Sequence, residues 1–252
     1  GMPATAVTKP AKAGRQKMAR KLQGARSTRA PSPAGTSPEL PARQASSTRQ
    51  PPAARQTQAE RRKKAEQAIL AAALQIIADR GLDELTLAEA GELAGYSRAL
   101  PAHYFASRDA ALVALCNFVV EKYLRRVQRH VPGREGLEGF LDRLVHYFDD
   151  GRKDPRVLRA FHAILGASPG KPELAKSLSR LAEESKATFA VYLRAGIARG
   201  EVRPDLVPEV EAVWILAALR GVMGQWLNDE HKTPVSKVRD AFVASVRRAL
   251  QA

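Results

Sequence analysis

Apolar residues recur at helical spacing along this chain from about residue 60 onward, and glycine and proline separate the helical stretches. No window shows the sustained alternation of apolar and polar residues that a half-buried β-strand requires. Of the 252 residues, 44% are hydrophobic but only 6% are aromatic, so the apolar content is largely Ala, Leu and Val. This bias suits helices better than sheets. The sequence therefore predicts an all-α fold.

The first expected helix opens with the charged run 60–64 and then carries an apolar stripe. Gly81 follows the stripe and offers a C-terminal cap. A second helix is expected to start at Thr86, because Thr86 and Glu89 have the spacing of a capping box, in which each side chain binds the other residue's backbone amide. This helix should run to about Leu93.

A turn at 94–96 is expected next, since Gly95 supplies the positive φ that such a turn commonly needs. Ser97 is then the candidate N-cap of a further short helix that reaches Tyr104 or Phe105. The three elements together form the pattern of a tri-helical helix-turn-helix, in which one helix braces the second and the third presents its first residues to a DNA groove.

Longer helices are expected in the rest of the chain. Ser107 should cap a helix that reaches roughly Arg129. Further helices are predicted at 135–150, 155–167, 172–199, 208–229 and 235–251. We therefore divide the chain into a disordered basic tail (1–57), a helix-turn-helix domain (58–106) and a larger helical domain (107–252).

The N-terminal segment carries most of the excess positive charge. Residues 1–58 contain eleven Lys or Arg and a single acid, Glu39. This segment therefore carries +10 of the chain's formal net charge of +15. Few large apolar residues are present there to offset the entropy of ordering, so disorder is expected. Three interpretations stay open: an arm that follows DNA phosphates, a solubilising extension, or a transit peptide.

Two stretches of this sequence resemble the TetR family of transcriptional regulators. Residues 85–98, LTLAEAGELAGYSR, follow the family's pattern of threonine, helix, Ala-Gly turn and Ser-Arg opening. Residues 103–112, HYFASRDAAL, match its closing segment of aromatic residues, serine, a basic and an acidic residue, and leucine. Residues 199–205 are similar to a loop that often precedes the two dimer-forming helices of the family.

The resemblance implies a set of DNA-contacting residues. Thr86 and Ser97 would face phosphates at helix N-termini. Arg98, Ala99 and Leu100 would reach base edges, with Arg98 suited to guanine and the two apolar side chains to a thymine methyl. Contacts to the DNA backbone would come from His103 and Tyr104 in the recognition helix, from Arg108 after it, and from Lys63 and Lys64 in the first helix.

Two residues depart from the family's pattern within the recognition helix. Ala102 stands where the family usually has a tyrosine, so one phosphate contact is missing or is shifted to Tyr104. Pro101 lies four positions after Ser97 and removes one backbone donor at the end of the first turn, where the loss is smallest.

The large domain is expected to hold an effector pocket between its helices. Aromatic and apolar residues on its helical stripes are the candidates for lining the pocket, with plain core packing as the alternative for each. These are Phe161, His162, Tyr192, Trp214 and Met223. By the family layout, the helices at 208–229 and 235–251 would form a homodimer interface, with Trp214 and Trp226 on different faces.

Several other functions find no support in the sequence. The five histidines form no HExxH or other metal-ligand spacing, and neither a GxxxxGK[ST] nor a GxSxG segment is present, so we expect no metal, no cofactor and no enzyme activity. The single cysteine, Cys116, indicates a buried thiol in a reducing cytoplasm. No transmembrane helix is expected, because the most apolar stretch is interrupted by Arg220 and Gln225.

The sequence thus predicts a cytoplasmic, homodimeric regulator that binds a double-stranded DNA operator, most simply a repressor that an unknown small-molecule effector releases. The alternative is an architectural protein that binds DNA with little sequence preference through its basic tail.

Overall fold

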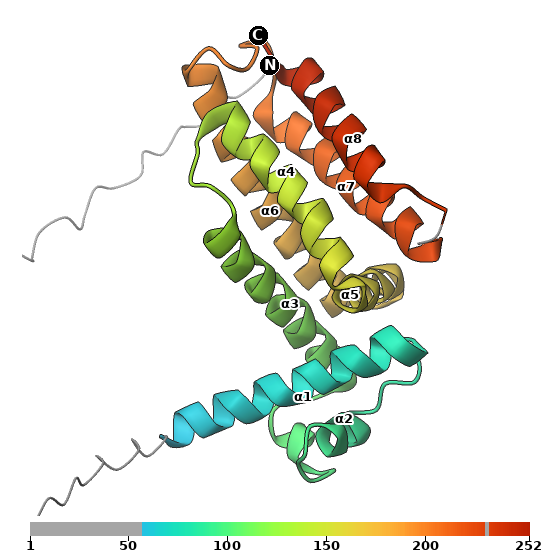
Figure 1. The fold of residues 1–252 in the computed structure, drawn as a ribbon. Helices are drawn as coiled ribbons and strands as arrows, with labels where there is room; N and C mark the ends of the chain where they lie inside the picture. Colours follow the sequence, from blue (N-terminus) through green and yellow to red (C-terminus); the bar gives the residue numbers. More distant parts are fainter. Residues whose placement is uncertain (1–56, 230–231) are drawn as a thin grey trace, which may run out of the picture. The chain divides into compact units, whose positions relative to one another are not determined.

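The computed structural model describes residues 57–229 and 232–252 (Figure 1). This part of the chain consists of eight α-helices and two 3₁₀ turns, which confirms the predicted all-α fold. The helices are α1 (Gln58–Arg80), α2 (Leu87–Leu93), α3 (Arg108–His130), α4 (Gly136–Lys153), α5 (Pro155–Ala167), α6 (Pro172–Ala198), α7 (Pro208–Asn228) and α8 (Val235–Leu250), and the 3₁₀ turns are η1 (Leu100–His103) and η2 (Ser168–Gly170). The predicted tail lies outside the described residues, except for Thr57.

Helix α1 is closed at both ends by residues that flank it. Thr57 Oγ1 accepts a hydrogen bond from the Glu60 amide at 3.2 Å, and the Glu60 carboxylate accepts one from the Thr57 amide at 2.8 Å. This capping box was not anticipated from the sequence. At the other end, Gly81 adopts a φ of +98° and donates its amide to the Ile77 carbonyl, so the predicted end of the helix is confirmed.

Helix α2 begins at the predicted Thr86 cap, but its capping box is only half formed. Thr86 Oγ1 accepts from the Glu89 amide at 3.2 Å. The Glu89 carboxylate does not return to the Thr86 amide, and instead accepts a 2.6 Å bond from the Arg80 guanidinium at the end of α1. The predicted reciprocal cap is therefore wrong, because a guanidinium within reach is a stronger partner for a carboxylate than a neutral amide.

The predicted turn at 94–96 is confirmed as the C-terminal cap of α2. Gly95 has a φ of +82° and donates its amide to the Glu92 carbonyl, while the Tyr96 amide reaches back to the Gly91 carbonyl, each at 2.9 Å. These two hydrogen bonds pair carbonyl groups that have no partner within the helix because they lie in its last turn. The chain therefore leaves α2 in a fixed direction.

The predicted short α-helix from Ser97 is replaced by the tighter turn η1. Ser97 makes no side-chain cap, and the residue before η1 is Ala99, so the prediction of Ser97 as N-cap is wrong. Pro101 gives the reason: it has no amide hydrogen for the Ser97 carbonyl, and in an α-helix its ring would collide there. That carbonyl instead accepts the Leu100 amide at 3.1 Å, which is the spacing of a 3₁₀ turn.

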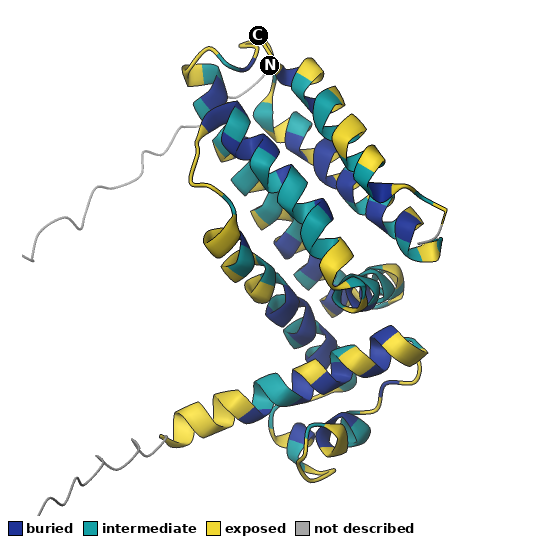
Figure 2. Cartoon of the chain, in the orientation of Figure 1, coloured by how far each residue is buried: buried dark blue, intermediate teal, exposed yellow. Residues whose placement is uncertain are grey.

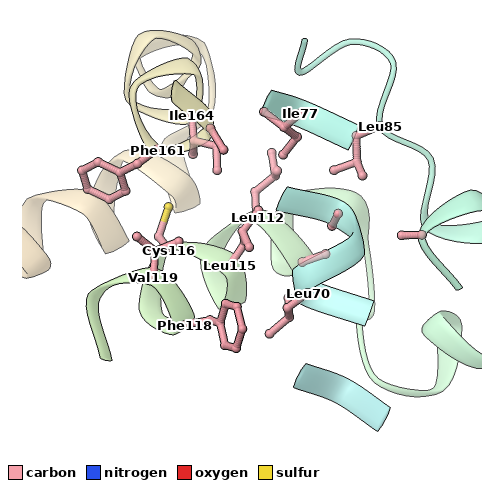
Figure 3. Packing of buried hydrophobic residues seen from close by; sticks show 14 of the residues in the cluster. Leu70, Ile77, Leu85, Leu112, Leu115, Cys116, Phe118, Val119, Phe161 and Ile164 are labelled. Atoms are coloured by element: carbon pink, nitrogen blue, oxygen red, sulfur yellow. The ribbon is translucent and has the colours of Figure 1, made fainter. Parts of the chain in front are cut away.

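Helix α3 runs from the head into the large domain and contributes to a core that both share. Ser107 Oγ accepts from the Ala110 amide at 3.0 Å, which confirms the predicted cap. Figure 3 shows Leu112, Leu115 and Cys116 of α3 between α1 on one side and α5 on the other. This core cluster crosses the predicted boundary at 106/107, so head and large domain pack together.

A second core joins α4, α6, α7 and α8, which run side by side in Figure 1. Phe140, Leu144 and Phe148 of α4 are fully buried there, together with Ile215 and Leu219 of α7. The predicted ranges for α4 to α8 agree with the observed helices to within a few residues.

Helix α7 is the one helix in the described part of the chain that is long and apolar enough to cross a membrane. Of its most apolar window, 33% is buried inside the protein. Its buried side includes Ile215, Leu219 and Met223, whereas Val210, Val213 and Trp214 on the other side remain exposed.

Candidate functional site

The helix-turn-helix is held together by a close approach between α2 and η1. A Cβ atom added to Gly91 would lie 2.8 Å from the Ser97 carbonyl oxygen and 2.9 Å from Pro101 Cγ. Only glycine therefore allows η1 to pack this tightly on α2. Pro101 and Phe105 are buried, and they anchor η1 to the head.

The residues predicted to read DNA lie on the outer side of this anchored turn. Ser97, Arg98, Ala99 and His103 are exposed, and Leu100 is half-buried against the core. The segment is thus helical in part and open to solvent, as a reading element must be. Its contacts to DNA stay a prediction.

Arg98 is held by an ion pair within the head. Its Nη1 atom lies 2.7 Å from Glu92 Oε2 near the end of α2, and the two side chains are 67% and 48% exposed. At this exposure the pair adds little to stability. It places the guanidinium beside the end of α2.

Two further predicted contacts lie near the start of α1 and α2. Lys64 is exposed on the first turns of α1, where Figure 2 shows an exposed surface. The Thr86 hydroxyl oxygen accepts a hydrogen bond from the Glu89 amide, which leaves the hydroxyl hydrogen available to donate to a phosphate.

The structure also brings Arg62 of α1 next to the predicted contact residue Tyr104, a neighbour that was not anticipated from the sequence. The Arg62 guanidinium lies 5.6 Å from the centre of the Tyr104 ring. The charged run 60–64 was the signal that could have indicated it.

Arg108 lies at the start of α3 but faces into the head. Its Nε donates to the Leu85 carbonyl at 3.2 Å, and one of its terminal nitrogens donates to the Leu82 carbonyl. The side chain therefore joins α3 to the loop between α1 and α2. A guanidinium has five N–H donors, so the phosphate contact predicted for Arg108 can use those that remain.

A cavity of about 170 Å³ lies between the helices of the large domain. Five helices, α3 to α7, contribute to its wall. The lining residues are Val119, Val120, Tyr123, Leu124, Arg126, Arg143, Tyr147, Asp150, Gly151, Asp154, Val157, Leu158, Phe161, Leu181, Glu184, Ser185, Thr188, Phe189, Leu216 and Arg220.

Of the five residues predicted to line a pocket, Phe161 lines this cavity. His162 lies against Gly224 of α7, and Met223 is fully buried in the second core. Tyr192 does not line the cavity but contacts a residue that does, because its hydroxyl accepts a 3.3 Å hydrogen bond from Arg143. Trp214 is 39% exposed on the surface of α7 and donates to Glu211 at 2.5 Å, so it faces away from the cavity.

The polar groups of the cavity include three arginines. Arg126 forms a bidentate pair with Asp150, with distances of 2.5 and 2.7 Å. Arg143 lies over the Tyr192 ring at 5.2 Å, and Arg220 lies over the Phe161 ring at 5.9 Å. Burial lowers the pKa of Arg220, because water is partly excluded from its guanidinium.

Two tyrosines complete the polar part of the cavity. Their rings meet edge to face, with 6.0 Å between the centroids of Tyr123 and Tyr147. Burial raises the pKa of Tyr147 to about 12, an effect that the nearby charge of Arg220 opposes, and burial also raises the pKa of Tyr123. Both phenols are therefore neutral hydrogen-bond donors at physiological pH.

Other titratable groups in the described residues form no recognisable catalytic or metal site. No group of three His, Cys, Asp or Glu side chains that could hold a metal ion occurs there. The Nε2 atoms of His146 and His162 are buried without a hydrogen-bond partner. Cys116 is fully buried, and burial raises its pKa to about 12.

A helix-turn-helix head that shares its core with a larger helical domain is the architecture of one class of protein, the DNA-binding transcriptional regulators. Sequence comparison then identifies the family. Residues 69–115 match the family model for bacterial regulatory proteins of the tetR family, and residues 131–227 match that for the tetracyclin repressor-like C-terminal domain. The protein belongs to the TetR family of DNA-binding transcriptional regulators.

Curated relatives support this assignment. The chain is 28% identical over 159 residues to the HTH-type transcriptional regulator BetI of Burkholderia cenocepacia, a match that covers 61% of this chain and 81% of the relative. BetI of Burkholderia thailandensis is 27% identical over the same length.

Solved structures share the fold. A TetR-family transcriptional regulator from Rhodococcus sp. superposes with a TM-score of 0.68 at 22% identity, and the match covers 75% of this chain and all of that one. The fatty acid degradation regulator FadR from Bacillus halodurans gives a TM-score of 0.65 at 16% identity, covering 73% of this chain and 94% of that one. FadR from Bacillus subtilis, solved in complex with stearoyl-CoA, gives 0.65 at 16% identity, with 72% and 97% covered.

Proposed function

We propose that this protein is a homodimeric repressor that leaves its DNA operator when a small molecule occupies the cavity of the large domain. The observation that carries the proposal is the position of α5, which lines the cavity on one side and packs against the DNA-binding head on the other. One structural neighbour, FadR from Bacillus subtilis, was solved with the small molecule stearoyl-CoA bound, and ligand binding of this general kind is proposed for the present chain.

Helix α5 connects the cavity to α1 through its two sides. Val157 and Phe161 line the cavity. Ala160 and Ile164 are buried in the core cluster that also contains Ile77 of α1 (Figure 3). An ion pair of 3.3 Å between Arg156 and Asp79 adds a second connection to α1. A ligand that displaces α5 would therefore displace α1 as well.

Helix α3 provides a second connection of the same kind. Its first turns carry Leu112 and Leu115 in the core of the head, and its later turns carry Val119 and Tyr123 in the wall of the cavity. Closely packed cores transmit shifts rather than absorb them. A ligand releases DNA to the extent that it binds one arrangement of these helices better than the other.

We place the proposed dimer interface on α7 and α8, the two helices expected from the sequence. The exposed side of α7 presents an apolar stripe of Val210, Val213 and Trp214, which are 59%, 51% and 39% exposed. A contiguous apolar stripe on a helix surface is typical of a protein–protein contact. Association through this face would place two copies of the head on one operator, with recognition elements in successive major grooves.

The proposed function is tested in two steps. A pool of random duplexes is first selected for binding to the full-length protein, and a preferred sequence with two related half-sites is expected. Fractions of a small-molecule mixture are then added to the complex of the protein with that duplex. Fluorescence anisotropy should show that at least one fraction releases the duplex from the protein. Selection that returns no preferred sequence contradicts the proposal.

A low-specificity architectural role is the alternative, and the charge of +10 in residues 1–58 is the observation that favours it. Deleting residues 1–56 distinguishes the two roles. The regulator should keep its preference for the selected duplex over a scrambled one and show a shallower dependence of affinity on salt. Loss of all DNA binding on this deletion would support the architectural role.

A further inference from the structure

The cavity of the large domain contains a cation, Arg220, that has no carboxylate partner in the described part of the chain. Arg220 lines the cavity and is half-buried, and no ion pair or hydrogen bond from it is found among the described residues. Its described contact is with the face of the Phe161 ring at 5.9 Å. Partial removal from water is costly for a guanidinium that lacks a counter-charge, so an anion entering the cavity would relieve that cost.

The carboxylates of the cavity do not neutralise this charge. Asp150 already accepts hydrogen bonds from Nε and Nη2 of Arg126, at 2.5 and 2.7 Å. Asp154 and Glu184 are exposed, and Glu184 lies 4.0 Å from Arg180. The acids are thus paired or at the exposed edge of the cavity.

Further hydrogen-bond donors line the same cavity. They include Arg143 and the two tyrosines Tyr123 and Tyr147, whose ring centroids are 6.0 Å apart. Arg143 makes its described polar contact with the Tyr192 hydroxyl at 3.3 Å and has no carboxylate partner among the described residues. Two phenolic hydroxyls and two guanidinium groups are the donor set that binds a carboxylate.

Most of the other side chains in the cavity wall are apolar, although Ser185 and Thr188 of α6 also line it. The apolar side chains come from four helices and include Val119, Val120, Leu158, Leu181, Phe189 and Leu216. Such a wall favours a hydrocarbon body over a polar one. A cavity of about 170 Å³ limits that body to a small molecule.

We propose that the effector is a small amphipathic organic anion, with a carboxylate head bound by Arg220 beside the Tyr147 hydroxyl and a hydrocarbon body against the apolar wall. This inference rests on the proposed function, because it assigns the chemical class of ligand to the same cavity.

Three probes with the same hydrocarbon chain and different heads test the charge preference on the wild-type, full-length protein. Octanoate, octanol and octyltrimethylammonium are titrated separately by isothermal calorimetry. Octanoate should bind about tenfold or more tightly than octanol, as expected for a hydrogen-bonded charge pair, and the ammonium compound should bind least well. Equal or tighter binding of octanol or the ammonium compound, or no binding of octanoate, overturns the inference.

Variants of Arg220 test the assignment of the head group. Arg220→Gln should lower octanoate affinity to that of octanol while octanol affinity stays unchanged, and Arg220→Lys should keep most of the preference. Arg239→Gln is the matched control, since Arg239 is also half-buried but pairs with Asp149 at 2.6 Å and does not line the cavity. An undiminished carboxylate preference in Arg220→Gln contradicts the assignment. Should Arg220→Gln not fold, the three-probe comparison on the wild type still decides the charge preference, and Tyr147→Phe, which should lower octanoate affinity but not octanol affinity, tests the position of the head group.

Failure of this inference and failure of the proposed function give different results. Anisotropy with the selected duplex is measured on the same preparations. If another class of small molecule releases the protein from its operator and octanoate is not preferred, only the carboxylate assignment is overturned. Octanoate binding with the expected preference but no release of DNA supports the assignment and contradicts the proposed release.

Discussion

The guanidinium of Arg98 lies 2.7 Å from the carboxylate of Glu92, across the turn that joins α2 to η1. The pair places the side chain that is expected to read a base next to a negative charge that DNA phosphates would repel. In its predicted role, Arg98 would leave the Glu92 carboxylate for the O6 and N7 acceptors of a guanine. This exchange makes the two residues opposite in their expected effects on operator affinity.

Arg98→Ala should weaken binding to the selected operator by about 1–3 kcal/mol and relax the preference at one base position, because a bidentate guanine contact is lost. Glu92→Gln should instead strengthen binding, since it frees Arg98 and removes a repulsive charge. Both affinities are measured by fluorescence anisotropy at one salt concentration. Unchanged affinity and selectivity in Arg98→Ala would remove the proposed role of that residue.

Gly91→Ala should destabilise the head by about 1–3 kcal/mol, because overpacking forces neighbouring atoms apart. The added methyl group would meet the Ser97 carbonyl oxygen at 2.8 Å and Pro101 Cγ at 2.9 Å, and neither group can move freely. Urea denaturation measures the effect. Gly166→Ala is the control, since no atom lies within 4 Å of a Cβ at that helical position, and it should be neutral or stabilising.

Val213→Glu should convert the proposed dimer to a monomer, because it places a charge within the apolar stripe of α7. Val213 is 51% exposed, so the fold of a single chain should tolerate the change. Sedimentation velocity gives the mass, and operator affinity should fall with it. Val191→Glu, at a position of α6 that is 61% exposed, controls for the added negative charge. A variant that sediments like the wild type argues against this face as the interface.

Stability should fall as the pH is lowered from 7 to 5, and His162 should contribute to this fall. Burial lowers the pKa of His162, and repulsion from Arg220 lowers it further. The folded protein then binds fewer protons than the unfolded chain, whose histidines titrate near pH 6.5, so acidification favours unfolding. The free energy of unfolding of His162→Gln should depend less steeply on pH in this range. Exposed His103→Gln serves as the control.

Cys116 should not react with Ellman's reagent in the native protein at neutral pH. The thiol is fully buried, and its pKa of about 12 leaves almost no thiolate to act as a nucleophile. One thiol should become reactive when the protein is unfolded in guanidinium chloride. Rapid labelling of the native protein would show that the core around α3 opens.

The helices were largely predictable from the sequence because caps and breakers are local signals. Gly81, Thr86, Gly95 and Ser107 act where the sequence placed them. The errors arose where a tertiary partner or a nearby proline competed with a local pattern. Glu89 left its predicted amide for Arg80, which is near it only in the folded protein.

The site was predictable in part for a similar reason. The exposure of Arg98 and His103 follows from a motif of adjacent residues. The cavity is formed by side chains of five helices, and no periodic pattern on one helix shows which of its sides meets a void. Phe161 and Trp214 have the same apolar character in the sequence, yet one lines the cavity and the other faces outward.

The passage of α3 through the core of the head has a consequence for how such regulators can be recombined. A head cut off after residue 106 would leave behind Leu112 and Leu115, which are nearly or fully buried against it. Grafting this head onto another ligand domain would therefore require carrying the matching turns of α3, and a partner surface equivalent to α5, across the junction. The DNA-binding motif alone is therefore not an exchangeable unit, because the packing interface between the two domains has to be transferred with it.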